Sequence, residues 1–333
     1  MQQEIDFVVT WVDGSDPAWQ QEKNRYLLQK QEDGNTERYR DWGLLKYWFR
    51  GVEKFAPWVR KVHFVTWGHL PDFLKEDAPK LHIVKHTDFI PAEYLPTFNS
   101  NAIEMHLHRI KGLSEQFVYF NDDIFPIRPL KKTDFFRDGK PCDMLAFQPV
   151  IANPENPVMS HIYLNNTLVL SKYFTKRENV KMQPPKYFKL GYPPKYFIYN
   201  LLELAFPQLT GFYTVHSASP FLRQSFLELW EKEGEVLRAT SMHRFRSEED
   251  VNPYLMREWQ KLSGNFAARN VAKDSVYYDI GNDNRRLCDA IRGQRAKLCC
   301  INDVDPAVSY ERARQQVAEA FEGILPEKSG FEK

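Results

Sequence analysis

The chain has 333 residues, of which 43% are hydrophobic and 27% charged, a globular composition that argues against intrinsic disorder. Its 45 basic and 44 acidic residues nearly cancel, so the chain lacks the basic excess typical of nucleic-acid-binding proteins. No apolar run approaches the roughly 20 residues of a membrane span, and the start lacks a signal-peptide pattern. We therefore expect a protein with reduced cysteines, in the cytoplasm or at the inner face of the membrane.

Predicted strands and helices alternate over the first part of the chain. The strands are Ile5–Val12, Val62–Thr66, Leu81–Val84 and Gln116–Phe120, with Lys297–Ile301 as a later strand. Apolar periodicity predicts one helix from a cap at Asp41 to Ala56 and another over Asn101–Ile110, where Asn101 and Glu104 have capping-box spacing. This alternation favours an α/β fold, with a doubly wound, Rossmann-like, mostly parallel sheet. Ligands bind beyond the C-terminal ends of such strands, the positions of Asp13-Gly14 and Asp122-Asp123.

The pattern is looser after about residue 140. Helices are predicted over Leu201–Phe206, Leu222–Leu237, Pro253–Leu262 and Ala307–Ile324. We expect an α/β core over 1–140 and 205–305, a helical, loop-rich insertion over 141–204 that is rich in Pro and aromatic residues, and a C-terminal helix and tail over 306–333. The insertion contains PPKYF twice, with basic residues upstream. These segments could face an anionic polymer or a membrane surface, or be solvated loops.

Two predicted strands end in carboxylates. Asn121-Asp122-Asp123 follows the strand Gln116–Phe120, and Asn302-Asp303 follows Lys297–Ile301. Strand-end carboxylates can hold Mg²⁺ or Mn²⁺ against a diphosphate, since hard divalent cations prefer oxygen ligands. An Asx turn or a helix cap would use the same residues.

Several other polar residues have both a functional and a structural interpretation. His216 follows an apolar run and could be a general base, a metal ligand or a hydrogen-bonded structural residue. On its predicted helix, His106 lies nearer than His108 to a cleft edge, and a half-buried role is the alternative. Arg38, Arg40 and Arg246 could bind phosphate or belong to solvated charge clusters. The Walker A, GxGxxG, GxSxG and HExxH motifs are absent.

Taken together and in order, these segments resemble the signature regions of the Stealth family of sugar-1-phosphate transferases. That family includes bacterial capsular polysaccharide phosphotransferases and the GlcNAc-1-phosphotransferase that tags lysosomal enzymes. The resemblance covers most of the chain and is strongest over 4–126. The matching segments are Ile5–Pro17, Arg38–Asp41, Ala56–Arg60, Phe64–Thr66, Leu95–Ser100, Ala102–Glu104, His106–Ile110, Phe120–Asp123, His216 in HSASP, and Asn302-Asp303.

The resemblance implies a GT-A-like fold and a reaction. A UDP-hexose or UDP-N-acetylhexosamine such as UDP-GlcNAc donates its sugar-1-phosphate to a sugar hydroxyl, forming a phosphodiester and releasing UMP. Catalysis of this kind rests on positioning and charge stabilisation. It also implies roles, with His216 as general base, Asp122, Asp123 and Arg246 in catalysis, and Mg²⁺ or Mn²⁺ on Asp122, Asp123 and Asp303. The implied substrate-binding residues are Thr10, Trp11, Asp13, Gly14, Arg40, Asn99, His106 and Asn121.

Two alternatives stay open. A metal-dependent glycosyltransferase would use the same sheet and carboxylates but attack the anomeric carbon and release UDP. A non-catalytic carbohydrate-binding protein would need fewer strand-end acidic groups than this chain carries. The expected partners are a nucleotide sugar and a sugar or polysaccharide acceptor, and not a nucleic acid. Peripheral membrane association and a homo-oligomer are both compatible with the sequence.

Overall fold

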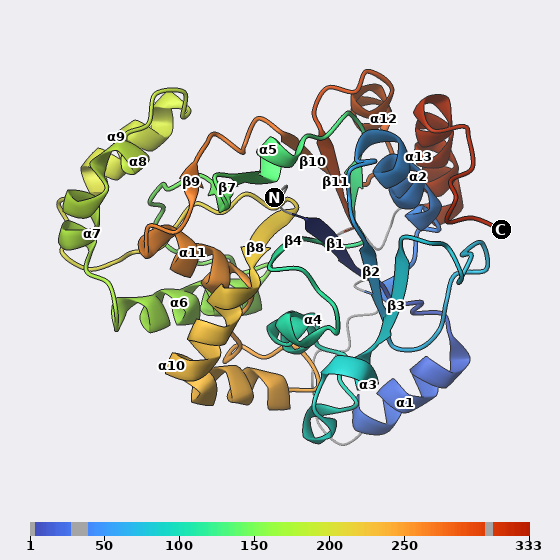
Figure 1. Cartoon of the computed structure of the whole chain (residues 1–333), viewed down its shortest axis with the longest axis horizontal. Helices are drawn as coiled ribbons and strands as arrows, with labels where there is room; N and C mark the ends of the chain where they lie inside the picture. The colour runs from blue at the N-terminus through green and yellow to red at the C-terminus, as the bar shows by residue number, and fades with distance from the viewer. Residues whose placement is uncertain (1–3, 28–38, 304–308) are drawn as a thin grey trace.

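The computed structural model describes residues 4–27, 39–303 and 309–333. Its main sheet has five strands in the order β3-β2-β1-β4-β8, in which only the edge strand β8 is antiparallel (Figure 1). The parallel order 3-2-1-4 reverses direction between β1 and β4, the place where doubly wound folds form their ligand crevice. The strands are β1 (Ile5–Thr10), β2 (Val62–Thr66), β3 (Leu81–Lys85), β4 (Gln116–Phe120) and β8 (Ser219–Leu222).

Both faces of this sheet are covered, because alternate residues of each strand point to opposite sides. On β1, Phe7 and Val9 pack in one buried cluster with α2 and α13, while Val8 packs in another with α10 and α11. This confirms the predicted doubly wound α/β architecture. The covering helices are α2 (Leu45–Phe55) and α13 (Tyr310–Ile324) on the first face, and α4 (Ser100–Met105), α10 (Arg223–Met242) and α11 (Tyr254–Leu262) on the second.

A second sheet, in the order β10-β11-β5, brings two distant strand ends together. β10 (Ser275–Asp279) is parallel to β11 (Leu298–Asn302), and β11 is antiparallel to β5 (Ile124–Pro126). The Ile301 N–H donates to the Asp123 carbonyl, 2.9 Å away. The C-terminal end of β11 therefore lies beside the residues that join β4 to β5.

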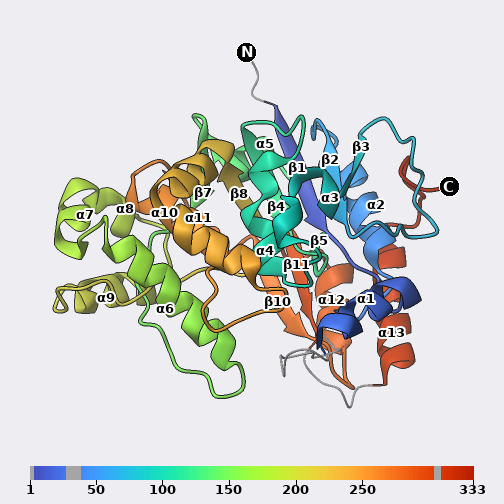
Figure 2. The ribbon, with the colours of Figure 1, turned by 90° about the horizontal axis from the view of Figure 1, so that it is seen from below.

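The segment between β7 (Lys140–Asp143) and β8 carries four helices at one end of the molecule (Figure 2). Val169, Leu170 and Tyr187 from this segment belong to the same buried cluster as Leu255 and Trp259 of α11. The segment thus shares a core with the α/β unit. Its helices are α6 (Pro157–Ser171), α7 (Lys176–Met182), α8 (Pro184–Tyr187) and α9 (Pro194–Glu203).

The smaller elements complete the chain. They are α1 (Pro17–Leu27), α3 (His86–Phe89), η2 (Ala92–Tyr94), η3 (Leu107–Arg109), α5 (Lys132–Phe135), β6 (Phe136–Arg137), β9 (Ala267–Ala268) and α12 (Arg285–Arg292). None of the helices in the described ranges is long and apolar enough to cross a bilayer. The four cysteines are buried and free.

The predicted strands agree closely with the structure, and the predicted helix starts need correction. The first long helix begins at Leu45 instead of at a cap on Asp41, whose carboxylate accepts a hydrogen bond from the Gly43 N–H in a turn. The next helix starts at Ser100, because Asn99 caps it by accepting a hydrogen bond from the Asn101 N–H, and it ends at Met105, where a 3₁₀ turn follows. Glu104 makes no capping box, because its carboxylate accepts a hydrogen bond from Tyr119 instead.

Candidate active site

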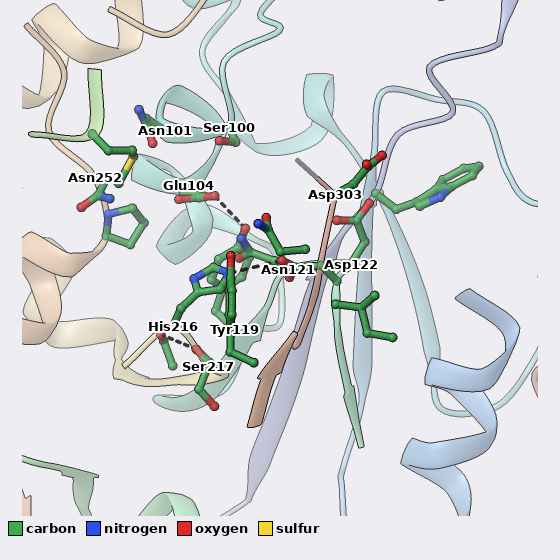
Figure 3. A pocket seen from close by; sticks show the side chains of 18 of the residues that line it. Ser100, Asn101, Glu104, Tyr119, Asn121, Asp122, His216, Ser217, Asn252 and Asp303 are labelled. Carbon is green, nitrogen blue, oxygen red and sulfur yellow. Dashed lines mark hydrogen bonds and ion pairs between the residues drawn. The ribbon is translucent and has the colours of Figure 1, made fainter. Parts of the chain in front are cut away.

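A cavity of about 480 Å³ opens at the C-terminal ends of β1, β4 and β11 (Figure 3). Its size suits a small molecule, because binding pockets for small molecules span roughly 300–1,000 Å³. Eight of the predicted site residues line it, namely Trp11, Arg40, Asn121, Asp122, Asp123, His216, Arg246 and Asp303. The sheet topology explains this convergence, since the ends of parallel strands share one edge and β11 reaches it through β5.

Carboxylates are gathered near the C-terminal ends of β4 and β11. Asp122 and Asp123 follow β4, Asp303 follows β11, and Asp41 also lines the wall. Figure 3 shows the side chains of Asp122 and Asp303 on the side of the cavity away from Glu104 and His216. Partial loss of hydration raises the pKa of Asp122 to about 7, and the nearby Asp123 and Asp41 carboxylates act in the same direction. Both effects disfavour the ionised form. Asp122 itself is open to solvent, which moderates this effect.

His216 sits between a carboxylate and a phenol. Its Nε2 lies 3.2 Å from Asp123 Oδ2, and its Nδ1 lies 2.9 Å from the Tyr254 hydroxyl. A carboxylate only accepts hydrogen bonds, so Nε2 carries the proton and the Nδ1 lone pair faces Tyr254. Burial raises the pKa of Tyr254 well above its usual value, which keeps this phenol protonated. The arrangement is a Tyr254–His216–Asp123 chain in which an acid orients the imidazole and a hydroxyl covers its basic nitrogen.

A second hydrogen-bonded chain also supports the cavity wall. Thr10 lies 2.9 Å from the Tyr119 hydroxyl, which donates to the Glu104 carboxylate at 2.8 Å. Burial raises the pKa of Glu104 to about 7, and the Tyr119 hydrogen bond offsets this only in part. Glu104 and Tyr119 both line the cavity, whereas Thr10 stands behind Tyr119. Thr10 therefore acts on the pocket through Tyr119.

Two arginines line the cavity from different segments. Arg40 lies 3.4 Å from Asp303, which also accepts a hydrogen bond from the Trp42 indole at 3.1 Å. Arg246 donates to the Ser100 hydroxyl at the start of α4, at 2.8 Å. Both guanidinium groups can offer parallel N–H donors to a phosphate. The other predicted arginine, Arg38, lies outside the described residues.

Asp13 and Gly14 shape the loop after β1 without lining the cavity. The Asp13 N–H donates to His69, and the Asp13 carboxylate closes a turn by accepting from Ser15. A Cβ on Gly14 would lie 1.9 Å from the Tyr39 carbonyl oxygen, so only glycine allows this close approach. These residues hold the backbone next to Arg40, and direct contact with a nucleotide is not supported by their placement.

Asn99 and His106 are buried away from the cavity, which corrects their predicted positions. The Asn99 amide donates to Asp250 and to the carbonyls of His243 and Phe245, so it ties α4 to the loop that contains Arg246. His106 is fully buried, 3.0 Å from the Ser241 hydroxyl of α10, and does not reach a cleft edge. Burial lowers the pKa of His106 to about 3, so its ring is neutral. Both residues support the helices around the cavity.

Several cavity residues were not predicted from the sequence to have a site role. Trp42, Glu104, Tyr119 and Tyr254 all line the cavity, as does Tyr163 from α6. Glu104 lies inside one of the matching segments but was interpreted as a capping residue. Tyr254 follows Pro253, so helix-start spacing was the only local signal at this position. The stacking of Tyr163 on Tyr254, with ring planes 4° apart, depends on tertiary packing alone.

The cavity contains side chains that could hold a divalent cation. Asp123 Oδ1 is buried, and no described residue donates a hydrogen bond to it. One group of ligand atoms, from Asp123, His216 and Cys300, lies within 4.8 Å of one another. Burial strongly raises the pKa of the Cys300 thiol, which then stays protonated and is a poor ligand. Asp123 and His216 remain in this group, and the Asp122 and Asp303 carboxylates line the same cavity outside it. Carboxylate oxygens are the ligands that Mg²⁺ and Mn²⁺ prefer.

Two family models match the chain. They describe Stealth protein conserved region 1, over residues 3–31, and Stealth protein conserved region 2, over residues 38–143. The matches include β1 and its loop, Arg40, and the Asn-Asp-Asp segment after β4. Both cavity-forming ends of the main sheet therefore lie within the matched regions.

Relatives that match over nearly their full length are named as polysaccharide phosphotransferases. A capsular polysaccharide phosphotransferase, WcwK, of Streptococcus pneumoniae is 41% identical over 99% of this chain and 98% of that protein. A receptor polysaccharide phosphotransferase, WefC, of Streptococcus oralis is 39% identical over 98% of this chain and 99% of its own length. An exopolysaccharide phosphotransferase, cps2G, of Lactiplantibacillus plantarum is 36% identical over 99% of this chain and 96% of that protein.

Among solved structures, a galactosyltransferase, LgtC, in complex with donor and acceptor sugar analogues aligns with a TM-score of 0.39. Its sequence identity is 10%, and the alignment covers 94% of this chain and 95% of that one. The family assignment rests on the sequence relatives, whose similarity runs through the whole chain and all of the cavity-forming segments. The chain belongs to the Stealth family and is a transferase enzyme of the phosphotransferase type.

Proposed function

We propose that the protein transfers a hexose- or N-acetylhexosamine-1-phosphate from a UDP-sugar to a sugar hydroxyl in the synthesis of a capsular or other cell-surface polysaccharide. The acceptor oxygen forms a bond to the β-phosphorus, and the bond from that phosphorus to the oxygen of UMP breaks. The proton of the acceptor hydroxyl passes to the enzyme, and UMP leaves. The bond between the anomeric carbon and its oxygen is kept, so the donor configuration is retained.

One observation carries this proposal. Asp122, Asp123 and Asp303 meet in one cavity with two arginines, Arg40 and Arg246. A diphosphate needs cations along its oxygens, and the attacked phosphorus develops charge that positioned donors stabilise. The relatives named as polysaccharide phosphotransferases support the class of reaction. We propose uracil as the base and a hexose or N-acetylhexosamine as the sugar because the sequence resemblance implies them.

Asp122, Asp123 and Asp303 would hold Mg²⁺ or Mn²⁺. When bound, the cation would neutralise the diphosphate and the departing UMP. The placement of Asp123 suits two tasks at once, because Oδ2 meets His216 while Oδ1 has no donor among the described residues. Arg40 would hold phosphate oxygens near Asp303, and Trp11 and Trp42 would offer apolar and aromatic surface to the nucleoside.

His216 would act as the general base together with Tyr254. Because Nδ1 already faces the Tyr254 hydroxyl, the acceptor proton would reach His216 through this phenol, or the acceptor would displace it. Asp123 would then stabilise the imidazolium through its bond to Nε2. This arrangement supports a base role better than a free histidine would, since the ring is held from both sides.

The acceptor would enter from the side of α6. Asn156, Met159 and Tyr163 line the cavity there. Aromatic rings such as Tyr163 and Tyr254 can cover the apolar face of a sugar, while Asn156 and Asn252 can bond its hydroxyls. The insertion predicted over 141–204 would thus provide the acceptor side of the pocket.

Product analysis tests the proposal. The purified protein is incubated with Mg²⁺, a set of UDP-sugars that includes UDP-GlcNAc, and sugar acceptors, and the nucleotides are then separated. We expect UMP that depends on the cation, with the sugar phosphate recovered in a phosphodiester. Release of UDP would instead assign attack to the anomeric carbon and refute phosphotransfer. Metal-dependent binding of UDP-sugars with no product under any acceptor would support a binding protein.

A further inference from the structure

Helix α9 in the insertion is exposed on its apolar side. Ile198, Leu201 and Leu202 are 56%, 64% and 61% exposed, while Asn200 and Glu203 are buried. At 100° per residue, the three apolar residues lie on one face of the helix and the two buried polar residues on the other. This is the reverse of the usual surface helix, which buries its apolar stripe.

Further exposed apolar side chains lie in the same insertion. Met182 ends α7, Leu190 lies in the turn before α9, and Phe206 follows α9, with exposed fractions of 72%, 91% and 55%. Both views of the ribbon place α7, α8 and α9 at the same end of the molecule (Figures 1 and 2). We call these residues the insertion patch, made of Met182, Leu190, Ile198, Leu201, Leu202 and Phe206. Single exposed apolar residues are ordinary, but six within residues 182–206, three of them on one face of α9, are typical of an interaction surface.

The same segment is strongly basic. Residues 172–203 contain seven Lys or Arg and two Glu, a net charge of +5 in a chain whose total is +1, so the remainder carries −4. Four of the basic residues, Arg177, Lys181, Lys189 and Lys195, are exposed, and no described carboxylate forms an ion pair with any of them. Positive charge is thus gathered around exposed leucines on an otherwise acidic protein.

We propose that the insertion patch docks on the surface of an anionic lipid bilayer. Ile198, Leu201 and Leu202 would enter the boundary between headgroups and acyl chains, with α9 lying in the plane of the interface. Lys189 and Lys195 would meet the lipid phosphates, whose surface potential attracts basic segments. The patch would hold the enzyme on the membrane by lying in its surface.

The chemistry of the patch favours lipid over two other occupants. A polysaccharide, even an anionic one, presents hydroxyls and carboxylates and offers no hydrocarbon to exposed leucines. A second copy docked through the same patch would bring two segments of formal net charge +5 together, and like charges at an interface are costly. An anionic bilayer satisfies both the apolar and the basic side chains.

Vesicle co-sedimentation tests the proposal with the full-length protein. The vesicles contain phosphatidylglycerol mixed with phosphatidylcholine, or phosphatidylcholine alone. We expect binding to the anionic vesicles that weakens about tenfold or more in Leu201→Asp/Leu202→Asp, because each leucine loses its burial in the acyl region. Lys189→Glu/Lys195→Glu should weaken binding by at least about fivefold for each lysine, and high salt should act in the same direction.

Matched controls use exposed residues outside the patch. Leu227→Asp/Met242→Asp changes two exposed apolar residues of α10. Lys75→Glu/Lys111→Glu changes two exposed lysines of the α/β unit, outside the insertion. Both controls should bind vesicles like the parent. Because all the sites are exposed, each variant should keep the melting temperature and the turnover of a soluble acceptor. This separates the docking test from the proposed reaction.

Three results would overturn the proposal. One is vesicle binding that the patch variants leave unchanged, or that is equal on phosphatidylcholine alone. Another is a dimer, seen by light scattering, that Leu201→Asp/Leu202→Asp dissociates while vesicles are not bound. The third is binding to an anionic polysaccharide that the lysine variant abolishes, again without vesicle binding.

Discussion

Asp123→Asn removes a charge from the cavity and leaves its shape intact. In the native protein Asp123 Oδ2 accepts from His216 Nε2 at 3.2 Å, and the buried Oδ1 accepts no hydrogen bond from any described residue. A hydrogen bond to a charged group is worth about 1.5–3 kcal/mol, or about 10- to 150-fold in rate when it holds the imidazolium. General base catalysis as a whole contributes about 10²- to 10⁴-fold. With the weakened cation site added, we expect kcat to fall by about 10²- to 10⁴-fold.

The assay for this variant is the initial rate of UMP release as Mg²⁺ is varied. The half-saturating Mg²⁺ concentration should rise along with the loss of kcat, while thermal unfolding changes little because Asn fills the same space. Asp283→Asn is the matched control, since this exposed carboxylate lies before α12 and pairs only with Arg285 among the described residues. A rate for Asp123→Asn within about threefold of the parent, at the same Mg²⁺ dependence, would refute both roles of Asp123.

Four further outcomes are expected. Tyr254→Phe should lower kcat about tenfold or more with the donor KM unchanged if its hydroxyl serves His216, and an unchanged kcat would remove Tyr254 from the proton path. Arg40→Ala should raise the KM for the UDP-sugar about tenfold or more in steady-state kinetics, since it removes a charged hydrogen-bond donor to the phosphate; an effect on kcat alone would contradict this. EDTA should stop UMP release and Mg²⁺ or Mn²⁺ should restore it, whereas full activity in EDTA would exclude a metal role. Asp143→Asn should cost about 3–5 kcal/mol in urea unfolding by leaving Arg257 buried without its partner, and a smaller loss would mean that solvent reaches Arg257.

The Asp143–Arg257 pair also predicts an acid dependence of stability. Burial alone would raise the pKa of Asp143, but the charges of Arg257 and Lys261 outweigh it and hold the pKa below its usual value. The folded state therefore binds fewer protons at this site than the unfolded state. The stability contributed by Asp143 is present above about pH 4 and is lost as the pH falls through the lower, folded-state pKa. Unfolding free energies of the parent and Asp143→Asn should converge at acidic pH, and a constant difference would contradict the assignment.

Local sequence patterns determined the strands and much of the site. Val62–Thr66 and Gln116–Phe120 are observed where they were predicted, because buried parallel strands are continuous runs of β-branched and aromatic residues between turns. Asp122 and Asp123 were predicted at a ligand-binding edge because they follow such a strand directly. The cavity supports this placement, since the ends of parallel strands share one edge of the sheet.

Helix starts were less predictable because several residues compete to cap the same helix. The spacing of Asn101 and Glu104 satisfies the capping-box rule, yet Asn99 caps α4 and Glu104 bonds to Tyr119. His106 shows the same limit. Helical geometry indicates which side of the helix it occupies, but the packing of α10 decides that this side is buried.

Only the tertiary structure shows which residues form the site, because these residues are far apart in the sequence. Asp303 reaches the cavity because β11 pairs antiparallel with β5. His216 has two hydrogen-bond partners, Asp123 and Tyr254, which lie 93 and 38 residues away from it in the sequence. Residue type alone made His216 a candidate base. Whether its nitrogens are free, held or buried depends on atoms supplied by other elements, and only the folded chain places those atoms.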